Sequence, residues 1–353
     1  MGYDLVQEGL FGPALGPLCR CVELAPEAPA ANYEFAYVLM KEFYHEEALQ
    51  FFAKAFELEQ APSIAFYMAQ LLMFLGRLQE AEAVVHKFAE LVNEASGEGR
   101  LQLVYLSQML QRLQTYGADT IRDWHFVQYG NILLRLFEED HPNEPNDSEG
   151  RYTFVNFDYQ QVANVLVGLQ TLIEQISVFP KYQYVAAAGA GSEPLAHALA
   201  ALLRLPVRSF AEMVKSGKNG IVIASFNDEV VEIAADVWER KELLFCSFAF
   251  SWTVEINIVP DAIGYLAQSA RLPWQERAEF DANGQPFRAE SDPRSAEQIA
   301  GEILRLVPTV DQVWLHRLKQ YCQKRTEHLM IGERMEVPRK KFFVHTALGG
   351  TRY

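Results

Sequence analysis

The sequence of 353 residues contains few cysteines, no long apolar run and fewer basic than acidic side chains. Its four cysteines are Cys19, Cys21, Cys246 and Cys322, of which only the first two are close in sequence. A Cys-x-Cys pair without a second pair does not match the ligand spacing of a zinc site, so we expect no metal centre. No apolar run approaches the roughly 20 residues of a membrane span, and the N-terminus lacks a basic-then-apolar signal pattern. We therefore expect a cytoplasmic protein with no membrane contact.

Basic residues are the scarcer charged class: 31 Lys and Arg stand against 46 Asp and Glu, which gives a formal net charge of −15. A nucleic-acid partner requires a basic surface for its phosphates, so the composition argues against one. The acid excess lies in residues 1–148, which hold 22 acidic and 9 basic residues, whereas the remainder holds 24 and 22. Such an acidic surface either attracts basic partners or is simply a solvated helix surface.

Small residues recur at a period of about 34 in the first part of the chain. Ala14, Ala48 and Ala81 stand 34 and 33 residues apart, each in a segment rich in bulky apolar residues. Ala36 and Ala69, in the segments upstream of the second and third, are 33 residues apart. Small residues allow the two helices of a hairpin to approach closely, so the pattern predicts stacked helix pairs.

This repeat, over roughly residues 1–96, resembles the tetratricopeptide repeat. The resemblance implies a helical solenoid whose groove binds a protein or peptide partner. Two further helices, at about residues 101–116 and 120–139, are predicted to extend or cap it, so that the module comprises residues 1–137. Residues 138–151 contain two prolines and almost nothing apolar, which predicts an interdomain linker.

From residue 152 onward, apolar runs alternate with helix-like segments. A long helix is expected over residues 157–178, followed by apolar runs at 182–189, 220–227 and 242–250 with helices at 193–203 and 228–239 between them. Runs that are apolar on both faces predict a parallel sheet covered by helices on both sides. The expected fold is therefore a helical solenoid followed by a mostly parallel, three-layer α/β domain over residues 152–353.

The last third of the chain is expected to be less regular. It is predicted to contain a short helix from residue 260, an exposed excursion over 275–294 with a turn at 281–286, and two helices over 295–307 and 310–326. Residues 342–346 are expected to return to the sheet as a strand.

Loops that leave the carboxyl ends of parallel strands are where ligands bind in such a sheet. The first loop contains two glycines before a predicted helix, a pattern that either lets the backbone approach a phosphate or allows tight packing of strand and helix. Asp228 and Glu229 follow the second strand, where they are either general bases or an ordinary helix start. The predicted ligand-binding residues are Gly189, Gly191, Ser192, Glu193, Asn227, Asp228, Ser251 and Trp252.

The glycine turn does not identify a cofactor. It lacks the third glycine of the dinucleotide fingerprint and the Gly-Lys-Ser/Thr of a P-loop. Two family resemblances remain. The order of elements over residues 158–250 resembles the phosphoribosyltransferase fold, which implies that the first loop contacts pyrophosphate, although the paired acids and the Thr-Gly-Gly run of that family are missing. Gly189-Ala190-Gly191 resembles the cofactor loop of S-adenosylmethionine-dependent methyltransferases.

Two functions follow from this sequence. One is an interaction or adaptor protein whose α/β domain binds a small ligand or is a catalytically degenerate relative of an enzyme. The other is a transferase that acts on a nucleotide-like or phosphorylated substrate, as the two resemblances imply. The first is favoured because the repeat period is a good signal, whereas the sheet-edge site lacks complete catalytic signatures.

Overall fold

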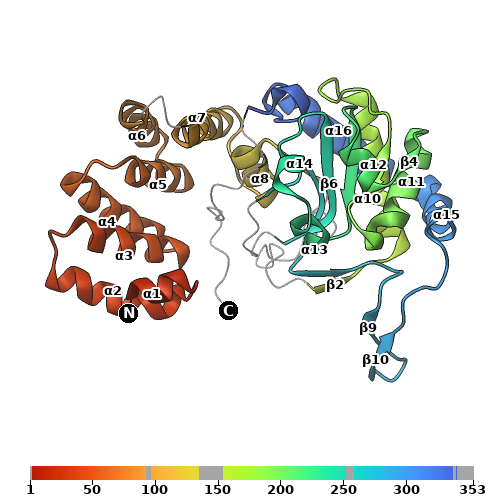
Figure 1. Cartoon of the computed structure of the whole chain (residues 1–353), viewed down its shortest axis with the longest axis horizontal. Helices are drawn as coiled ribbons and strands as arrows, with labels where there is room; N and C mark the ends of the chain where they lie inside the picture. The colour runs from red at the N-terminus through yellow and green to blue at the C-terminus, as the bar shows by residue number, and fades with distance from the viewer. Residues whose placement is uncertain (1, 93–96, 135–153, 252–257, 337–338, 340–353) are drawn as a thin grey trace. The chain divides into compact units, whose positions relative to one another are not determined.

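The computed structural model describes residues 2–92, 97–134, 154–251, 258–336 and 339 (Figure 1). The chain divides between Gln128 and Tyr129 into two units, each described here by itself. The predicted linker at 138–151, the predicted strand at 342–346 and Trp252 lie outside the described residues.

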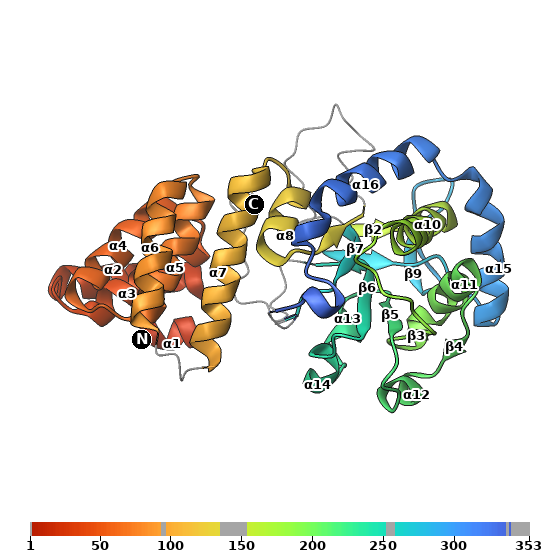
Figure 2. The same cartoon turned by 90° about the horizontal axis from the view of Figure 1, so that it is seen from above.

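The first unit is helical. Its helices are α1 (Gly2–Gln7), α2 (Phe11–Leu24), α3 (Pro29–Lys41), α4 (His45–Leu58), α5 (Pro62–Phe74), α6 (Leu78–Leu91), α7 (Gly97–Tyr116) and α8 (Ile121–Tyr129). From α1 to α7, each helix packs against the next one along the chain (Figure 2). Pro29 and Pro62 stand at the first positions of α3 and α5, where proline costs no helical hydrogen bond.

The periodic small residues lie where these helices meet. Ala14, Ala36, Ala48, Ala69 and Ala81 are all fully buried. Any larger side chain there would separate neighbouring helices, so the small size is a packing requirement. The predicted helices of this part are confirmed as far as Tyr129.

The predicted helix at residues 120–139 is wrong over residues 130–134, and residues 135–139 lie outside the described residues. Helix α8 ends at Tyr129, and Gly130 then adopts a left-handed conformation with φ 63°. A side chain on Gly130 would also meet the Met330 side chain at 2.6 Å. Strand β1 (Ile132–Leu133) follows and pairs with β7 of the second unit's sheet, so the α/β unit receives a strand from before the predicted linker.

His45, at the start of α4, makes the helical unit sensitive to acid. Its ring stacks on Phe74, and burial lowers its pKa from 6.5 to about 4. The unfolded chain therefore binds a proton that the folded unit does not, so stability falls as the pH drops from 6.5 toward 4. We expect acidification from pH 7 to pH 5 to remove about 2 kcal/mol through this residue. Urea unfolding followed by helical circular dichroism measures the loss, and in His45→Phe this contribution should disappear. An unchanged pH slope in that variant would contradict the assignment.

The second unit is built on a six-stranded parallel sheet. Its strands follow the order β1-β7-β6-β5-β3-β4, and every neighbouring pair is parallel. Besides β1 they are β3 (Val185–Ala187), β4 (Val207–Arg208), β5 (Gly220–Ala224), β6 (Leu243–Phe250) and β7 (Ala262–Leu266). Every residue of β5, β6 and β7 is buried, which is why these segments are continuously apolar in sequence.

Helices cover both faces of this sheet, as Figure 2 shows. α10 (Tyr159–Gln175) and α11 (Glu193–Leu203) pack together on one face, with α15 (Ala296–Leu306) and α16 (Gln312–Arg325) against them. The short helices α12 (Phe210–Val214), α13 (Asn227–Val231) and α14 (Ala235–Trp238) lie on the other face. This division follows from right-handed crossovers, because the chain moves from β3 to β4 in one direction and from β5 to β6 in the other. The predicted α/β architecture is confirmed.

Two predicted elements of this unit are corrected. The segment predicted as one helix over 228–239 is two helices, because Ala234 adopts an extended conformation with ψ 144°. The helix predicted from residue 260 is strand β7, followed by β8 (Ser269–Arg271), which pairs with β2 (Phe154–Asn156). Gly264 lets β7 lie close to β6, since a side chain there would stand 2.2 Å from the Phe248 carbonyl oxygen.

The excursion over residues 275–294 is a β-hairpin formed by β9 (Arg277–Phe280) and β10 (Pro286–Ala289) (Figure 1). The turn predicted between them is confirmed, with Gly284 at φ 78°. The two helices predicted after it are confirmed as α15 and α16.

Candidate functional site

The strand order places a switch point between β3 and β5. From β3 the chain crosses to β4 on one side, and it returns to β5 on the other. In doubly wound sheets of this order, ligands bind in the crevice where the strands on either side of that point end. The glycine turn after β3 and the loop after β5 meet at this edge of the sheet. The structure therefore brings the first two predicted ligand loops together.

The Glu229 carboxylate occupies this position. Glu229 comes from α13, and its Oε2 accepts hydrogen bonds from the Ser225 N–H and the Ser225 hydroxyl, both at 2.8 Å. The Ser192 hydroxyl, on the turn after β3, donates to the same oxygen. Ser192 and Ser225 are 0% and 4% exposed, so their donor groups are almost completely shielded from water. One carboxylate thus joins the loops that leave β3 and β5.

The two glycines of the turn make room for this carboxylate. A Cβ at Gly189 would lie 2.6 Å from Glu229 Oε1, and one at Gly191 would lie 3.0 Å from the same atom. Gly189 has φ −151° and ψ 177°, an extended conformation that any residue adopts. Space, and not a special backbone conformation, is therefore what requires glycine at this position. Both sequence interpretations of this turn, ligand binding and tight packing of strand and helix, stay predictions, because the atoms nearest to Gly189 belong to Glu229 of α13.

Trp274, in the segment that leads into the hairpin, packs on the glycine turn. The Trp274 indole N–H donates to the Gly191 carbonyl oxygen at 2.9 Å, and the Trp274 ring lies 6.2 Å from that of Tyr159 at the start of α10. Trp274 is 6% exposed. The prediction of site residues missed Trp274, whose signal in the sequence is a bulky aromatic residue directly before a long polar segment.

Arg294, which contacts Tyr159 at the start of α10, is paired with acids of its own chain. Arg294 contacts Asp292 at 2.6 Å, Glu302 at 3.1 Å and the Tyr159 hydroxyl at 3.1 Å. Its hydrogen bonds lower the pKa of Asp292 to about 2. An anionic ligand would have to compete with both carboxylates for this guanidinium.

The remaining predicted residues are more scattered. Asp228 and Glu193 are exposed in the first turns of α13 and α11, and Asn227 is the first residue of α13. Ser251 is buried directly after β6. Ligand binding by these four residues stays a prediction, as does a general-base role for Asp228 or Glu229.

Within the described ranges of the chain, no group of three or more His, Cys, Asp or Glu side chains is placed to hold a metal ion. No helix in the same ranges is both long and apolar enough to span a bilayer.

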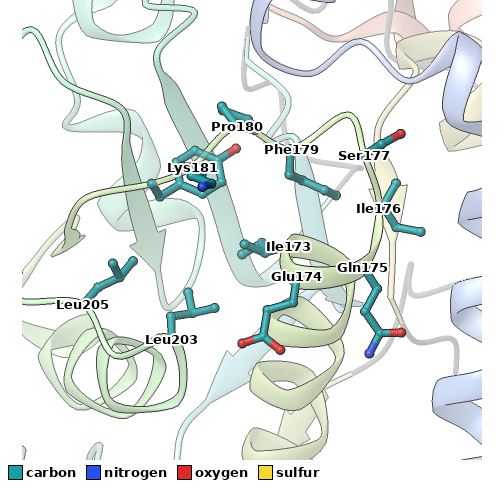
Figure 3. A pocket seen from close by; sticks show the side chains of 11 residues that line it. Ile173, Glu174, Gln175, Ile176, Ser177, Phe179, Pro180, Lys181, Leu203 and Leu205 are labelled. Atoms are coloured by element: carbon teal, nitrogen blue, oxygen red, sulfur yellow. The ribbon is translucent and has the colours of Figure 1, made fainter.

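A pocket of about 640 Å³ lies at the opposite edge of the sheet (Figure 3). Its walls are the last turn of α10, the end of α11 and the segments that lead into β3 and β4. Since the strands are parallel, this is the amino-terminal edge, away from every predicted ligand loop.

Comparisons with known proteins identify no family. No family model and no curated protein matches this sequence. Among solved structures, a mutant of the O-GlcNAc transferase from Thermobaculum terrenum matches with a TM-score of 0.32 and 11% identity, over 71% of this chain and 52% of that one. The match therefore spans about half the length of that transferase, and at this TM-score it establishes no common function.

Proposed function

We propose that this chain is an adaptor that binds a protein partner through its helical unit and whose α/β unit is a catalytically silent relative of an enzyme. The observation that carries the proposal is the Glu229 carboxylate, which fills the switch point where a ligand of such a sheet would bind. It accepts hydrogen bonds from both loops that would otherwise offer donors to a substrate. Because this crevice of the α/β unit is occupied, the main activity in this proposal is the binding of a protein partner by the helical unit.

A tetratricopeptide-like solenoid is supported by the period of the buried alanines and by the sequential packing of α1 to α7. Half-buried tyrosines of α3 and α5 supply a contact surface. Tyr33 and Tyr37 of α3 and Tyr67 of α5 form a cluster with ring centroids 5.7 to 6.5 Å apart. Tyrosines with part of the ring exposed are frequent anchors of protein interfaces. Together with the acid excess of residues 1–148, they favour a basic partner segment.

A transferase remains the second candidate, because the donors around Glu229 suit an anion. Two serine hydroxyls and one backbone N–H converge on a single oxygen, an arrangement that also binds a phosphate oxygen. A phosphorylated substrate would have to displace Glu229 to use them.

Partner capture with matched baits tests the adaptor proposal. Wild-type chain, Tyr37→Ala and Tyr44→Ala are immobilised and exposed to an extract of the cells that make the protein. The Tyr37→Ala bait is expected to capture at least about fivefold less partner than wild type, a typical effect for an interface residue. The Tyr44→Ala bait, altered outside the cluster, is expected to capture as much as wild type. A Glu229→Gln bait also captures as much, because the silent crevice takes no part. Capture that survives in Tyr37→Ala, or a wild-type bait that retains nothing above background, would contradict the proposal.

A further inference from the structure

The pocket at the amino-terminal edge of the sheet has an apolar wall. Its volume of about 640 Å³ lies in the range of small-molecule sites, which are mostly apolar with a few polar groups. The apolar side chains of the wall come from the ends of α10 and α11 and from the segments before β3 and β4. They are Ile173, Ile176, Phe179, Leu203 and Leu205. This wall suits an aliphatic or aromatic group.

Two opposite charges border the apolar wall. Glu174 comes from the last turn of α10, and Lys181 comes from the segment before β3. In Figure 3 the side chain of Ile173 lies between those of Glu174 and Lys181. Both charged side chains are exposed and lie outside the core, so a ligand can reach them. A ligand that spans the wall meets a carboxylate at one side and an ammonium group at the other.

The C-terminal ends of α10 and α11 differ in whether their carbonyl groups are already hydrogen-bonded. At the end of α11, the carbonyls of Ala200 and Ala201 accept the N–H groups of Leu205 and Arg204, and that of Leu202 accepts the Gln170 amide. At the end of α10, the Leu172 carbonyl accepts the Ile176 N–H, and the last three carbonyls of the helix have no further helical N–H to accept. The α10 end, with Glu174, is therefore the side that favours a cation.

We propose that this pocket binds a small zwitterion with apolar side chains, of the class of an apolar dipeptide or a free apolar amino acid. The ligand ammonium group lies at Glu174 and the end of α10, and its carboxylate lies at Lys181. The apolar side chains cover Ile173, Leu203 and Leu205. This site is independent of the Glu229 crevice, which lies at the other edge of the sheet.

Titration of the full chain with leucyl-leucine and two of its derivatives tests the assignment. N-acetyl-leucyl-leucine lacks the ammonium group, and leucyl-leucine amide lacks the carboxylate. We expect each derivative to bind about fivefold more weakly than the dipeptide, the upper range for exposed charge pairs. Glu174→Gln should weaken leucyl-leucine by the same factor and leave the acetylated probe unchanged. Lys181→Gln should weaken leucyl-leucine and leave the amide unchanged.

The location is read from methyl resonances of Ile173 and Leu203, which should shift on binding. Lys215→Gln, an exposed lysine in another part of the unit, serves as the matched control and should bind all three probes as wild type does. No binding of leucyl-leucine at millimolar concentration, equal affinity for the three probes, or shifts confined to other methyl groups would each overturn the proposal.

Discussion

Replacing Arg339 by methionine is expected to lower the free energy of unfolding of the α/β unit by about 3–5 kcal/mol, the usual cost of removing one partner of a buried ion pair. Arg339 Nε lies 2.7 Å from Asp261 Oδ1, and the two side chains are 2% and 3% exposed. The same guanidinium donates to the carbonyl oxygens of Trp238 at 2.7 Å and Leu243 at 2.5 Å. It also lies over the ring of Phe245 at 4.7 Å. The Arg339 side chain thus links the first residue of β6 to the residue directly before β7.

The cost arises from what the substitution leaves behind. Burial raises the pKa of Asp261, and the Arg339 guanidinium and the Phe245 N–H oppose that shift by favouring the carboxylate. Without Arg339, Asp261 is a buried carboxylate with a single donor, or it takes up a proton. A second substitution, Asp261→Asn, keeps an acceptor for the Phe245 N–H and removes the charge. We therefore expect the double variant to recover part of the loss.

Urea unfolding of the full chain measures both effects. Arg288→Met is the matched control, because Arg288 pairs with Glu276 at an exposed position of the hairpin and its loss should leave the midpoint unchanged. A loss below about 1 kcal/mol in Arg339→Met, the value of a surface pair, would show that the pair is not buried in solution. A double variant as unstable as the single one would show that the uncompensated charge is not the cause.

Replacing Gly189 by alanine is expected to cost about 2–3 kcal/mol, the usual penalty for overpacking a filled site. The new methyl group would lie 2.6 Å from Glu229 Oε1 and 2.9 Å from its Cγ and Cδ atoms. Either the carboxylate leaves its three donors or the turn moves. In a Glu229→Ala background, the same substitution should cost almost nothing, because the extended backbone of Gly189 suits alanine.

A double-mutant cycle of Gly189→Ala and Glu229→Ala isolates this coupling, which we expect to be about 2 kcal/mol. Gly217→Ala is the control, since a side chain there meets nothing within 4 Å. Additive losses, with no coupling between positions 189 and 229, would place the carboxylate elsewhere than in the turn.

Much of the fold is readable from the sequence for physical reasons. Strands β3, β5 and β6 are apolar on both faces because helices cover both, so they appear as continuous runs. Helix α11 was predicted with both its bounds, and in the structure it ends where Arg204 adopts a left-handed conformation. Strand β1 was missed because its two residues are fixed by a partner about 130 residues away, with Asn131 bonded to Pro260. Strand β7 was misread as a helix, although it lies between β1 and β6 in the sheet.

The candidate site shows the same limit. Sequence periodicity located the loops after β3 and β5, because both follow buried strands. It did not show that Glu229 reaches back to Ser192, 37 residues earlier, or that Trp274 closes the turn at Gly191, 83 residues away. Such contacts depend on the strand order of the sheet, which local residue patterns do not encode.

The Glu229 carboxylate of this chain occupies the switch point, where a ligand of such a sheet would bind. The most direct test of this occupancy is a titration of wild type and Glu229→Ala with inorganic phosphate, followed by the amide resonances of Ser192 and Ser225. We expect no shift of these amides in wild type at millimolar phosphate, and saturable shifts in Glu229→Ala, where the donors are released. Saturable phosphate binding at the same amides in wild type, as tight as in the variant, would contradict the occupancy of the switch point by Glu229 and favour the transferase.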